Sequence, residues 1–590
     1  MNLKSMKQRG GLIFILSIFV FSVTLYAEIP NHNYPRTVFH HFGNASMDYY
    51  ARFDMVIKST RSTSWIDDVR ALNPDIIILS TSSWSVYADR DEWWPPGTSD
   101  NYLALDSNGD PVVIPSNGYL TDITNYNPPY NDQKLNEALP EHIVSITDLT
   151  AFDGVACDWL WTQPWGVSDI DLDRNGVNDY SEYGKTWVNA EFNEGNEALL
   201  VNFRNLIPDG KLLICNSGGL HRYGTSTTNG ACWEHVTNLN NFSWNWSQYQ
   251  YFMEHFQEPQ TPWFLCHNHA SDPETPARSK DYYKLMRFLL TFTLLGDAYF
   301  SYMDSQAGEY TYNYWYDEYE LQLGYPKGPA QQMSNGCLAR VFDRGLSILN
   351  PTGSDKTVTV SDISGLDGYS GPYYRFYGGQ DPDFNDGSLF DQVVLWGSTA
   401  WNDQLRGDGI ILMTQPDTVV SDIIIDNINP GTSPGSDPAT FSGNWTQSND
   451  YSRAYYVSTK SYMGHYVHAY TNSGTGSDQV DFVPTITRPG KYEVFEWHGE
   501  VPSLAGATNV PHIITHAGGA STVVVDQTQN LGQWNSLGIY TFDIGTSGKL
   551  EINNNANGFV IADAVKFVLQ HAEPDLEAPA PPTGVEVFQL

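Results

Sequence analysis

The sequence predicts several domains: a parallel (β/α)8 TIM barrel, then a small antiparallel β domain and a β-sandwich. Three observations lead to this fold class. Between residues 35 and 330, apolar runs of strand length alternate with stretches of helical pattern. Over residues 331–412 the predicted strands are short, with frequent turn signals and no long helix. A second all-β region covers residues 420–570 and has a Gly-, Pro- and Ser-rich stretch near its start.

Eight apolar runs are predicted to be the barrel strands, because eight parallel strands close such a barrel. In chain order they cover residues 36–43, 74–84, 118–124, 152–161, 211–219, 231–236, 262–268 and 297–304. Helical patterns are expected from the end of the first run to Arg70, and over 132–149, 183–207 and 279–296. The fourth run reads FDGVACDWLW and places Asp158 at the C-terminal mouth of strand four.

The two ends of the chain are predicted to lie outside these domains. Lys4, Lys7 and Arg9 precede an apolar run that ends at Ala27, which is the pattern of a secretory signal peptide over residues 1–27. We therefore expect a secreted, cell-surface or periplasmic protein; the length of the run leaves an uncleaved membrane anchor open. Residues 571–590 read as a Pro-rich linker that ends like the first strand of a fibronectin type III module.

The charge of the chain argues against nucleic acid and anionic membranes as partners, and its cysteines argue against a disulfide framework or a zinc site. The chain has 68 acidic and 31 basic residues, a formal net charge of −37. Such a surface repels nucleic acid and anionic membranes, so neither is an expected partner. The five cysteines are odd in number and lack zinc-ligand spacing, so we interpret them as buried hydrophobic residues.

The clearest local motif is DLDRNGVNDYSE, which matches the calcium-loop pattern D-x-[DN]-x-[DN]-G-x5-E at every defined position. Within a loop over residues 169–182, the predicted Ca²⁺ ligands are the side chains of Asp171, Asp173, Asn175, Asp179 and Glu182, with the Val177 carbonyl. We expect the Ca²⁺ to be structural. The alternative is an Asp- and Asn-rich surface loop that folds without a metal.

Two carboxylates are predicted at strand mouths in apolar surroundings. Asp158 lies between Cys157 and Trp159, and Glu234 follows Trp233 at the mouth of strand six. Apolar neighbours raise the pKa of a carboxyl, as an acid catalyst requires. Such a pair suits cleavage of a glycosidic bond, with Asp158 as nucleophile or base and Glu234 as general acid. The alternative is that one or both are structural.

Other side chains near strand ends are candidates for binding sugar hydroxyls or stacking on sugar rings. The chain has 18 Trp, 36 Tyr and 27 Phe, many of them in loop-like stretches such as WLWTQPW and NFSWNWSQYQYF. The candidate substrate-binding residues are His41, Trp84, Asp122, Trp159, Trp161, Asn216, Trp233, His267, Asn268 and Asp304. Asp153 lies at the opposite end of its strand from Asp158 and is interpreted as a cap or turn residue.

The barrel region resembles known glycosyl hydrolases. FDGVACDWLW is similar to the strand-four motif of a group of (β/α)8 glycosyl hydrolases, which share their plan with clan D enzymes and endo-polygalactosaminidases. RVFDRGLSILNPT, residues 340–352, resembles the trailing β domain of such barrels. The resemblance implies that Asp158 takes the catalytic strand-four position and Glu234 a strand-six acid position. Clan D similarity also implies a retaining mechanism.

The second β region resembles the golvesin C-terminal domain, which accompanies xanthan lyases and other polysaccharide-active enzymes. The matching stretches are VPHIITHAGGASTVVVDQTQNLGQWNSLGIYTF and GFVIADAVKFV, residues 510–542 and 558–568. The resemblance implies a β-sandwich that either binds carbohydrate or spaces and stabilises the barrel.

These features favour a secreted glycoside hydrolase that cleaves within a polysaccharide chain. No phosphate loop or dinucleotide fingerprint occurs. Two other interpretations stay open: a non-catalytic glycan-binding surface protein, and a polysaccharide lyase, which only the golvesin-like region favours.

Overall fold

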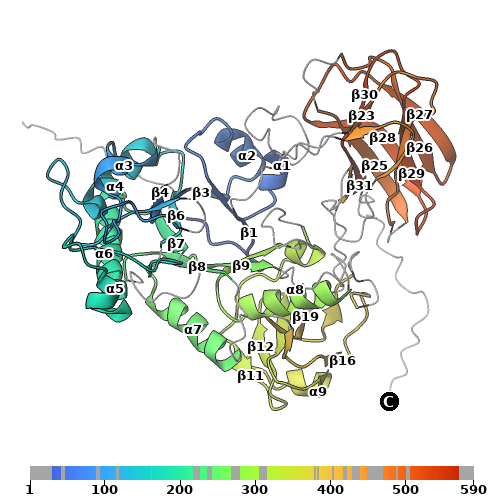
Figure 1. Cartoon of the computed structure of the whole chain (residues 1–590). Coiled ribbons are helices and arrows are strands. Elements are labelled where there is room, and N and C mark those ends of the chain that lie inside the picture. Colours follow the sequence, from blue (N-terminus) through green and yellow to red (C-terminus); the bar gives the residue numbers. More distant parts are fainter. Residues whose placement is uncertain are drawn as a thin grey trace, which may run out of the picture.

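The structure is a computed structural model, in which three parts follow one another along the chain (Figure 1). It describes residues 29–40, 45, 47–87, 93–114, 118–160, 163–216, 226–234, 242–267, 280–303, 315–377, 381, 384–401, 404–415, 422–427, 439–447, 469–486, 489–499 and 505–570. The predicted signal peptide and the tail 571–590 lie outside these residues. Among the helices described, none has both the length and the apolar character that crossing a bilayer requires.

An eight-stranded parallel sheet forms the barrel, which confirms the predicted fold class. In sheet order its strands are β1 (Val38–Phe39), β2 (Met55–Lys58), β3 (Ile77–Ser83), β6 (Gly154–Asp158), β7 (Leu212–Asn216), β8 (Gly230–Glu234), β9 (Trp263–His267) and β10 (Tyr299–Met303). The last strand meets the first through a parallel bridge between Thr37 and Phe300. At this bridge the Phe300 N–H donates to the Arg36 carbonyl at 2.9 Å.

One predicted barrel strand is wrong and another was missed. Residues 118–124 contribute β5 (Tyr119–Leu120), which pairs antiparallel with β4 (Val86–Tyr87) outside the barrel. The second barrel strand is instead β2, inside the region predicted to be helical up to Arg70. Tyr119 is exposed and Leu120 is buried, which fits a half-buried hairpin rather than a barrel strand covered on both faces. The two errors offset each other in the count, so Asp158 still ends the fourth strand.

The start of β6 explains the first half of the motif FDGVACD. Asp153, just before β6, accepts hydrogen bonds at 2.8 Å from both the Arg70 guanidinium and the Ile78 N–H. A Cβ on Gly154 would lie 2.1 Å from the Leu212 carbonyl oxygen, so only glycine fits where β6 meets β7. Asp153 is therefore structural, as the sequence predicts.

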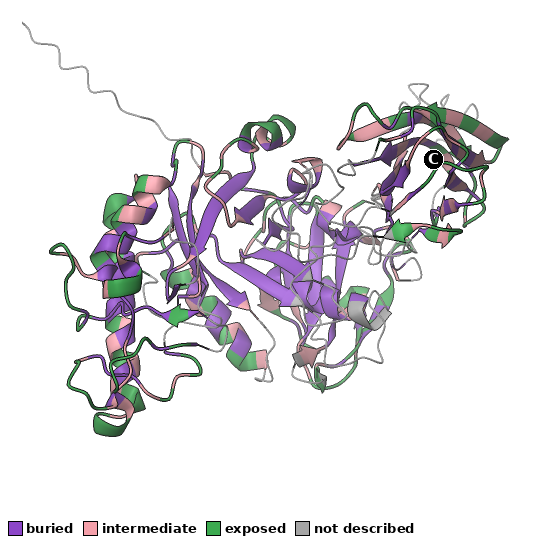
Figure 2. Ribbon diagram, turned by 45° about the horizontal axis from the view of Figure 1, so that its top comes forward, coloured by how far each residue is buried: buried purple, intermediate pink, exposed green. Residues whose placement is uncertain are grey.

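Helices cover the outside of the barrel, and their faces alternate between buried and exposed residues (Figure 2). They are α1 (Met47–Tyr50), α2 (Ile66–Leu72), α3 (Thr98–Asn101), α4 (Leu135–Ile146), α5 (Asp179–Glu182), α6 (Lys185–Leu206), α7 (Phe242–His255) and α8 (Lys280–Thr293). The predictions for 132–149, 183–207 and 279–296 correspond to α4, α6 and α8. The stretch NFSWNWSQYQYF, predicted to be loop-like, largely forms α7, because residues four apart such as Asn245 and Tyr249 lie on one buried face.

The small β domain packs against α8. Its five-stranded sheet is ordered β11 (Gln331–Gln332), β12 (Leu338–Val341), β13 (Gly345–Asn350), β19 (Asp408–Met413) and β15 (Tyr374–Arg375). Two further strand pairs and a short helix complete it: β14 (Lys356–Thr359) with β16 (Gln392–Leu395), β17 (Thr399–Trp401) with β18 (Gln404–Arg406), and α9 (Val360–Ile363). Arg287 of α8 is buried and bonds Asp381 at 2.9 Å and Asp408 at 3.5 Å. These ion pairs join the barrel to the β domain.

The third part is a β-sandwich with its own hydrophobic core. One sheet is ordered β20 (Ile423–Asp426), β31 (Ala564–Leu569), β25 (Gly490–Trp497) and β28 (Trp534–Phe542). The facing sheet is ordered β21 (Thr440–Ser442), β24 (Gln479–Phe482), β29 (Lys549–Asn553), β26 (Val510–His516) and β27 (Gly519–Val525). A smaller sheet holds β22 (Thr446–Gln447), β23 (Ala469–Thr471) and β30 (Val560–Ala562). The Trp534 indole N–H donates to Asp48 of α1 at 2.9 Å, which ties the sandwich to the barrel.

All five cysteines are buried and free, as the sequence predicts: Cys157, Cys215, Cys232, Cys266 and Cys337. Cys157 and Cys215 are register partners on β6 and β7 but are not bonded to each other. Burial raises the pKa of the Cys215 thiol to about 12. The thiols therefore stay protonated and contribute as small apolar groups.

Replacing Asp153 tests its structural role. Asp153→Ala leaves the Ile78 N–H and the Arg70 guanidinium without their shared acceptor, so we expect the free energy of unfolding to fall by about 1.5–3 kcal/mol. The measurement is urea unfolding followed by tryptophan fluorescence. Asp209→Ala, at an exposed turn, is the control and should unfold like the wild type. Equal stability of Asp153→Ala and the wild type would contradict the assignment.

Candidate active site at the mouth of the barrel

Three polar side chains end three neighbouring barrel strands. Asp158, Asn216 and Glu234 are the last residues of β6, β7 and β8. Two residues before each of them, Ala156, Ile214 and Cys232 belong to the cluster that fills the barrel interior. Because side chains along a strand alternate between faces, the three polar groups lie on the same interior face, at the C-terminal mouth.

The Asn216 amide joins the two carboxylates. Its nitrogen Nδ2 donates to Asp158 Oδ1 at 3.2 Å and to Glu234 Oε1 at 2.8 Å. The two oxygens therefore lie no farther apart than the sum of these distances. Asn216 is buried, whereas both carboxylates are partly exposed and can be reached from the mouth. The structure thus brings together the two predicted catalytic residues and one predicted substrate-binding residue.

Burial raises the pKa of both carboxyls. The pKa of Asp158 rises to about 6, opposed by hydrogen bonds from the Asn216 amide and the Trp159 N–H. The pKa of Glu234 rises to about 7, because burial is reinforced by the nearby charge of Asp158 and opposed only by Asn216. Near neutral pH the pair therefore favours a proton on Glu234 and a negative charge on Asp158.

The backbone after β6 turns sharply beside Asp158. Trp159 has φ = 61°, in the left-handed region that a bulky side chain rarely adopts. Its neighbour Leu160 donates its N–H to the Asn216 carbonyl at 2.7 Å, which holds the turn against β7. This conformation lets the Trp159 N–H point at the Asp158 carboxylate. Strain of this kind clusters at functional sites, which agrees with the position of Trp159 at the mouth.

Two tryptophans predicted to stack on sugar are core residues instead. Trp84 is fully buried, and its ring stacks on Phe203 of α6 with centroids 4.0 Å apart. Trp233 is 3% exposed and packs edge-on against rings that include Phe264 and Phe292. Along the chain, each of these tryptophans follows a residue that faces the barrel interior. Their rings therefore point outward to the helices, where no sugar can reach them. The prediction for both is wrong.

Asp122 does not end a barrel strand, because β5, within residues 118–124, pairs with β4 outside the barrel sheet. It is buried, and Thr124 donates to its Oδ1 through both its N–H at 3.1 Å and its hydroxyl at 2.6 Å. Burial raises its pKa to about 6, while Arg174 of the predicted calcium loop lowers it. Asp122 therefore belongs to the structure beside that loop.

Five further candidates lie wholly or partly outside the described residues. His41, Trp161, Asn268 and Asp304 lie outside the described residues. His267 ends β9 and pairs with Met303 of β10 through the backbone, but its side chain is outside the description.

Two basic residues that were not predicted as site residues lie at the end of the missed strand β2 and just after it. Lys58 ends β2, its Nζ lies 5.4 Å from the Tyr50 ring centroid, and burial lowers its pKa to about 8. Arg61 follows and bonds the hydroxyls of Ser80 and Ser82, the latter at 3.1 Å. The sequence signal for β2 is the short run MVIK, in which three apolar residues precede Lys58. A strand assigned to this run would have placed Lys58 at its C-terminal end.

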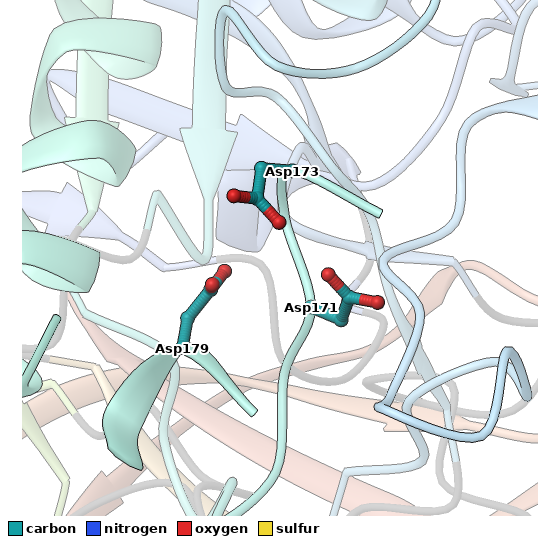
Figure 3. Close-up of side chains that lie close together, drawn as sticks. All are labelled: Asp171, Asp173 and Asp179. Carbon is teal, nitrogen blue, oxygen red and sulfur yellow. The ribbon is translucent and has the colours of Figure 1, made fainter. Parts of the chain in front are cut away.

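The predicted calcium ligands gather between β6 and α6. Asp171, Asp173 and Asp179 each offer an oxygen within 4.8 Å of the others, and their carboxylates face one space (Figure 3). Asn175 Nδ2 donates to Glu182 Oε2 at 2.9 Å, so these two predicted ligands are in contact with each other. The side chain of Val177 is exposed, and only its carbonyl was predicted to act.

Comparisons with known proteins agree with this division of the chain. Residues 70–346 match the family described as hypothetical glycosyl hydrolase family 15, and residues 431–569 match the Golvesin C-terminal domain. Both resemblances expected from the motifs are thereby confirmed.

The relatives whose names state an activity match a small share of the chain or match it at low sequence identity. Xanthan lyase of Bacillus sp. (strain GL1) is 33% identical over 150 residues, which are 25% of this chain and 14% of the lyase. The structure of a Paenibacillus xanthan lyase aligns with 21% identity and a TM-score of 0.21, over 42% of this chain and 26% of that one. The glycoside hydrolase domain of PelA from Pseudomonas aeruginosa aligns with 8% identity and a TM-score of 0.30, over 47% of this chain and 98% of that domain.

The barrel strands from β3 onward, with the paired carboxyls, fall inside the first family match, and most of the sandwich falls inside the second. The chain is thus similar to hypothetical glycosyl hydrolase family 15 over residues 70–346 and to the Golvesin C-terminal domain over residues 431–569.

Proposed function

We propose that this chain is a secreted glycoside hydrolase that cleaves within a polysaccharide and retains the anomeric configuration. The observation that carries the proposal is the pair of carboxyls bridged by Asn216, with pKa values near 6 for Asp158 and 7 for Glu234. Glycoside cleavage needs this combination of one protonated and one ionised carboxyl on either side of a single bond. The family description of the barrel supports the same class of reaction.

Asp158 then acts as the nucleophile, and Glu234 acts first as general acid and then as general base. Glu234 donates its proton to the glycosidic oxygen as the bond to the anomeric carbon breaks, and Asp158 attacks that carbon to form a glycosyl-enzyme ester. Water, deprotonated by Glu234, then hydrolyses the ester and restores both groups. Retention is supported by the resemblance of the strand-four motif to clan D enzymes.

Substitution of either carboxyl tests the proposal. Asp158→Asn and Glu234→Gln should each lower the rate of reducing-end release from a susceptible polysaccharide by about 10²–10⁴-fold, because each removes one proton-transfer or nucleophilic role. Glu254→Gln, which neutralises an exposed carboxyl on α7, is the matched control and should keep full activity. Binding of a polysaccharide without cleavage, unchanged in both variants, would favour the non-catalytic alternative.

The pH dependence of the reaction follows from the two pKa values. Activity requires Asp158 ionised and Glu234 protonated, so the acidic limb should fall near pH 6 and the basic limb near pH 7. We expect a narrow bell between them, measured as kcat/KM for one polysaccharide from pH 4 to 9. The two limbs belong to the coupled pair. A rate that stays flat from pH 5 to 9 would contradict these roles.

The same shifts predict an effect on stability. A carboxyl whose pKa is raised by folding stabilises the fold fully below its unfolded pKa of about 4, and this contribution is lost as the pH rises through its folded pKa. For Glu234 that loss occurs around pH 7. Glu234→Gln should therefore raise the Tm relative to the wild type at pH 8.5 and leave it nearly unchanged at pH 4, as measured by scanning calorimetry.

A polysaccharide lyase is the second candidate, favoured by the similarity of part of the chain to a xanthan lyase. A lyase acts on a uronate, but Lys58 and Arg61 do not favour a uronate site, because Lys58 and the Arg61 partners Ser80 and Ser82 alternate with the residues that fill the barrel interior. Ultraviolet absorbance of the products separates the two reactions. Lyase products are unsaturated and absorb, whereas hydrolysis releases reducing ends without that absorbance.

A further inference from the structure

The loop between β6 and α6 concentrates negative charge in a small volume. Asp171, Asp173 and Asp179 converge within 4.8 Å, and their carboxylates face a common space (Figure 3). Glu182 reaches the same loop through Asn175, whose amide nitrogen lies 3.1 Å from Asp173 Oδ2 and 2.9 Å from Glu182 Oε2. Four carboxylates thus share twelve residues with a single basic side chain, that of Arg174.

Asp179 provides a second, independent observation that points to a cation. Its side chain is fully buried, and its Oδ2 accepts the Leu172 N–H at 2.6 Å. Its other oxygen, Oδ1, is also buried and has no hydrogen-bond partner. An unpaired buried carboxylate oxygen is costly, whereas a cation beside it would satisfy it. Figure 3 shows that the Asp179 carboxylate faces Asp171 and Asp173.

A second acidic turn in the same chain lacks this feature. Asp106 starts the turn DSNGD, is only partly buried, and accepts the N–H groups of Asn108 at 2.8 Å and Asp110 at 3.0 Å. These hydrogen bonds lower the pKa of Asp106. Asp179 is instead fully buried, and its Oδ1 has no hydrogen-bond partner among the described residues. Acidic turn composition alone therefore does not explain the loop at 171–182.

We propose that this loop binds Ca²⁺ through Asp171, Asp173, Asn175, the Val177 carbonyl, Asp179 and Glu182. A set of four carboxylates, an amide and a carbonyl matches the oxygen ligands and the coordination number that Ca²⁺ takes. Mg²⁺ keeps several of its waters and demands rigid octahedral geometry, which a flexible loop satisfies less well. Gly176, at φ = 84°, makes the tight turn in the middle of the loop.

Binding requires one local rearrangement. The Asn175 side chain donates its NH₂ to two carboxylates and so stands where a cation would otherwise balance them. With Ca²⁺ bound, the amide turns and presents Oδ1 to the metal, which releases Asp173 and Glu182 as ligands. Asp171 is already oriented, because the Asn175 and Gly176 N–H groups hold its two oxygens at 3.0 and 2.7 Å.

The position of the loop tells what the metal does for the fold. The Asp171 N–H donates to the Leu105 carbonyl at 2.8 Å, and Ser107 donates to Asp169 at 2.7 Å through its hydroxyl. The loop therefore connects three segments. They are β6, which carries Asp158, the helix α6, and the segment between β3 and β6 that contains the β4–β5 hairpin. Ca²⁺ holds these three segments together, so its effect is on stability first.

The test is calcium binding to the full chain after removal of metal with EDTA. Titration calorimetry should give one site with a Kd of about 10⁻⁵–10⁻³ M, and saturating Ca²⁺ should raise the Tm by several degrees. Asp179→Asn should weaken binding at least tenfold. If Asp179→Asn does not fold, Asp173→Asn serves instead, because Asp173 is only partly buried. Asp106→Asn is the matched control and should bind Ca²⁺ like the wild type.

Three outcomes would overturn the proposal. One is the absence of both heat and Tm shift for the wild type at 5 mM Ca²⁺. Another is an equal loss of affinity in Asp173→Asn and Asp106→Asn, which would mean diffuse binding to an acidic surface. The last is an equal response to Mg²⁺, which would show attraction to charge without a calcium site. None of these readouts depends on enzymatic activity.

Discussion

Two carboxyl groups in a water-poor barrel mouth repel each other, and Asn216 relieves part of that repulsion. One amide nitrogen donates to both groups, so it partly stabilises two negative charges while it sets their separation. The relief is incomplete, because the pKa values of Asp158 and Glu234 still rise. Burial and the charge of Asp158 raise the pKa of Glu234 above that of Asp158, so near neutral pH the proton favours Glu234.

The motif FDGVACD places two aspartates with different tasks on one strand. Asp153 and Asp158 are five residues apart, an odd spacing, so a strand points them to opposite faces. Asp153 faces outward to Arg70 of α2, and Asp158 faces the barrel interior beside Asn216. The first anchors the strand against a helix at the bottom of the barrel. The second lies at the C-terminal mouth of the barrel, where the Asn216 amide joins it to Glu234.

Much of the fold could be predicted because hydrophobic runs and turn signals are local. The barrel, the order of its later strands and the two β regions follow from such patterns. β2 could not be recognised, because three apolar residues in a row look the same in a short strand and in a helix face. For the site, Asp158, Asn216 and Glu234 were predictable as residues that end apolar runs. The stacking roles given to Trp84 and Trp233 failed because composition does not say on which side of a strand an aromatic ring lies.

The cysteines have a consequence for how the chain reaches its folded state. Every thiol is buried and none is cross-linked, so the fold draws no stability from covalent closure of loops. The folded structure therefore contains no cystine that a reductant could cleave, and its stability rests on packing, hydrogen bonds and ion pairs. The unfolded chain, in contrast, exposes five thiols, so burial of the cysteines during folding is what keeps them from reacting.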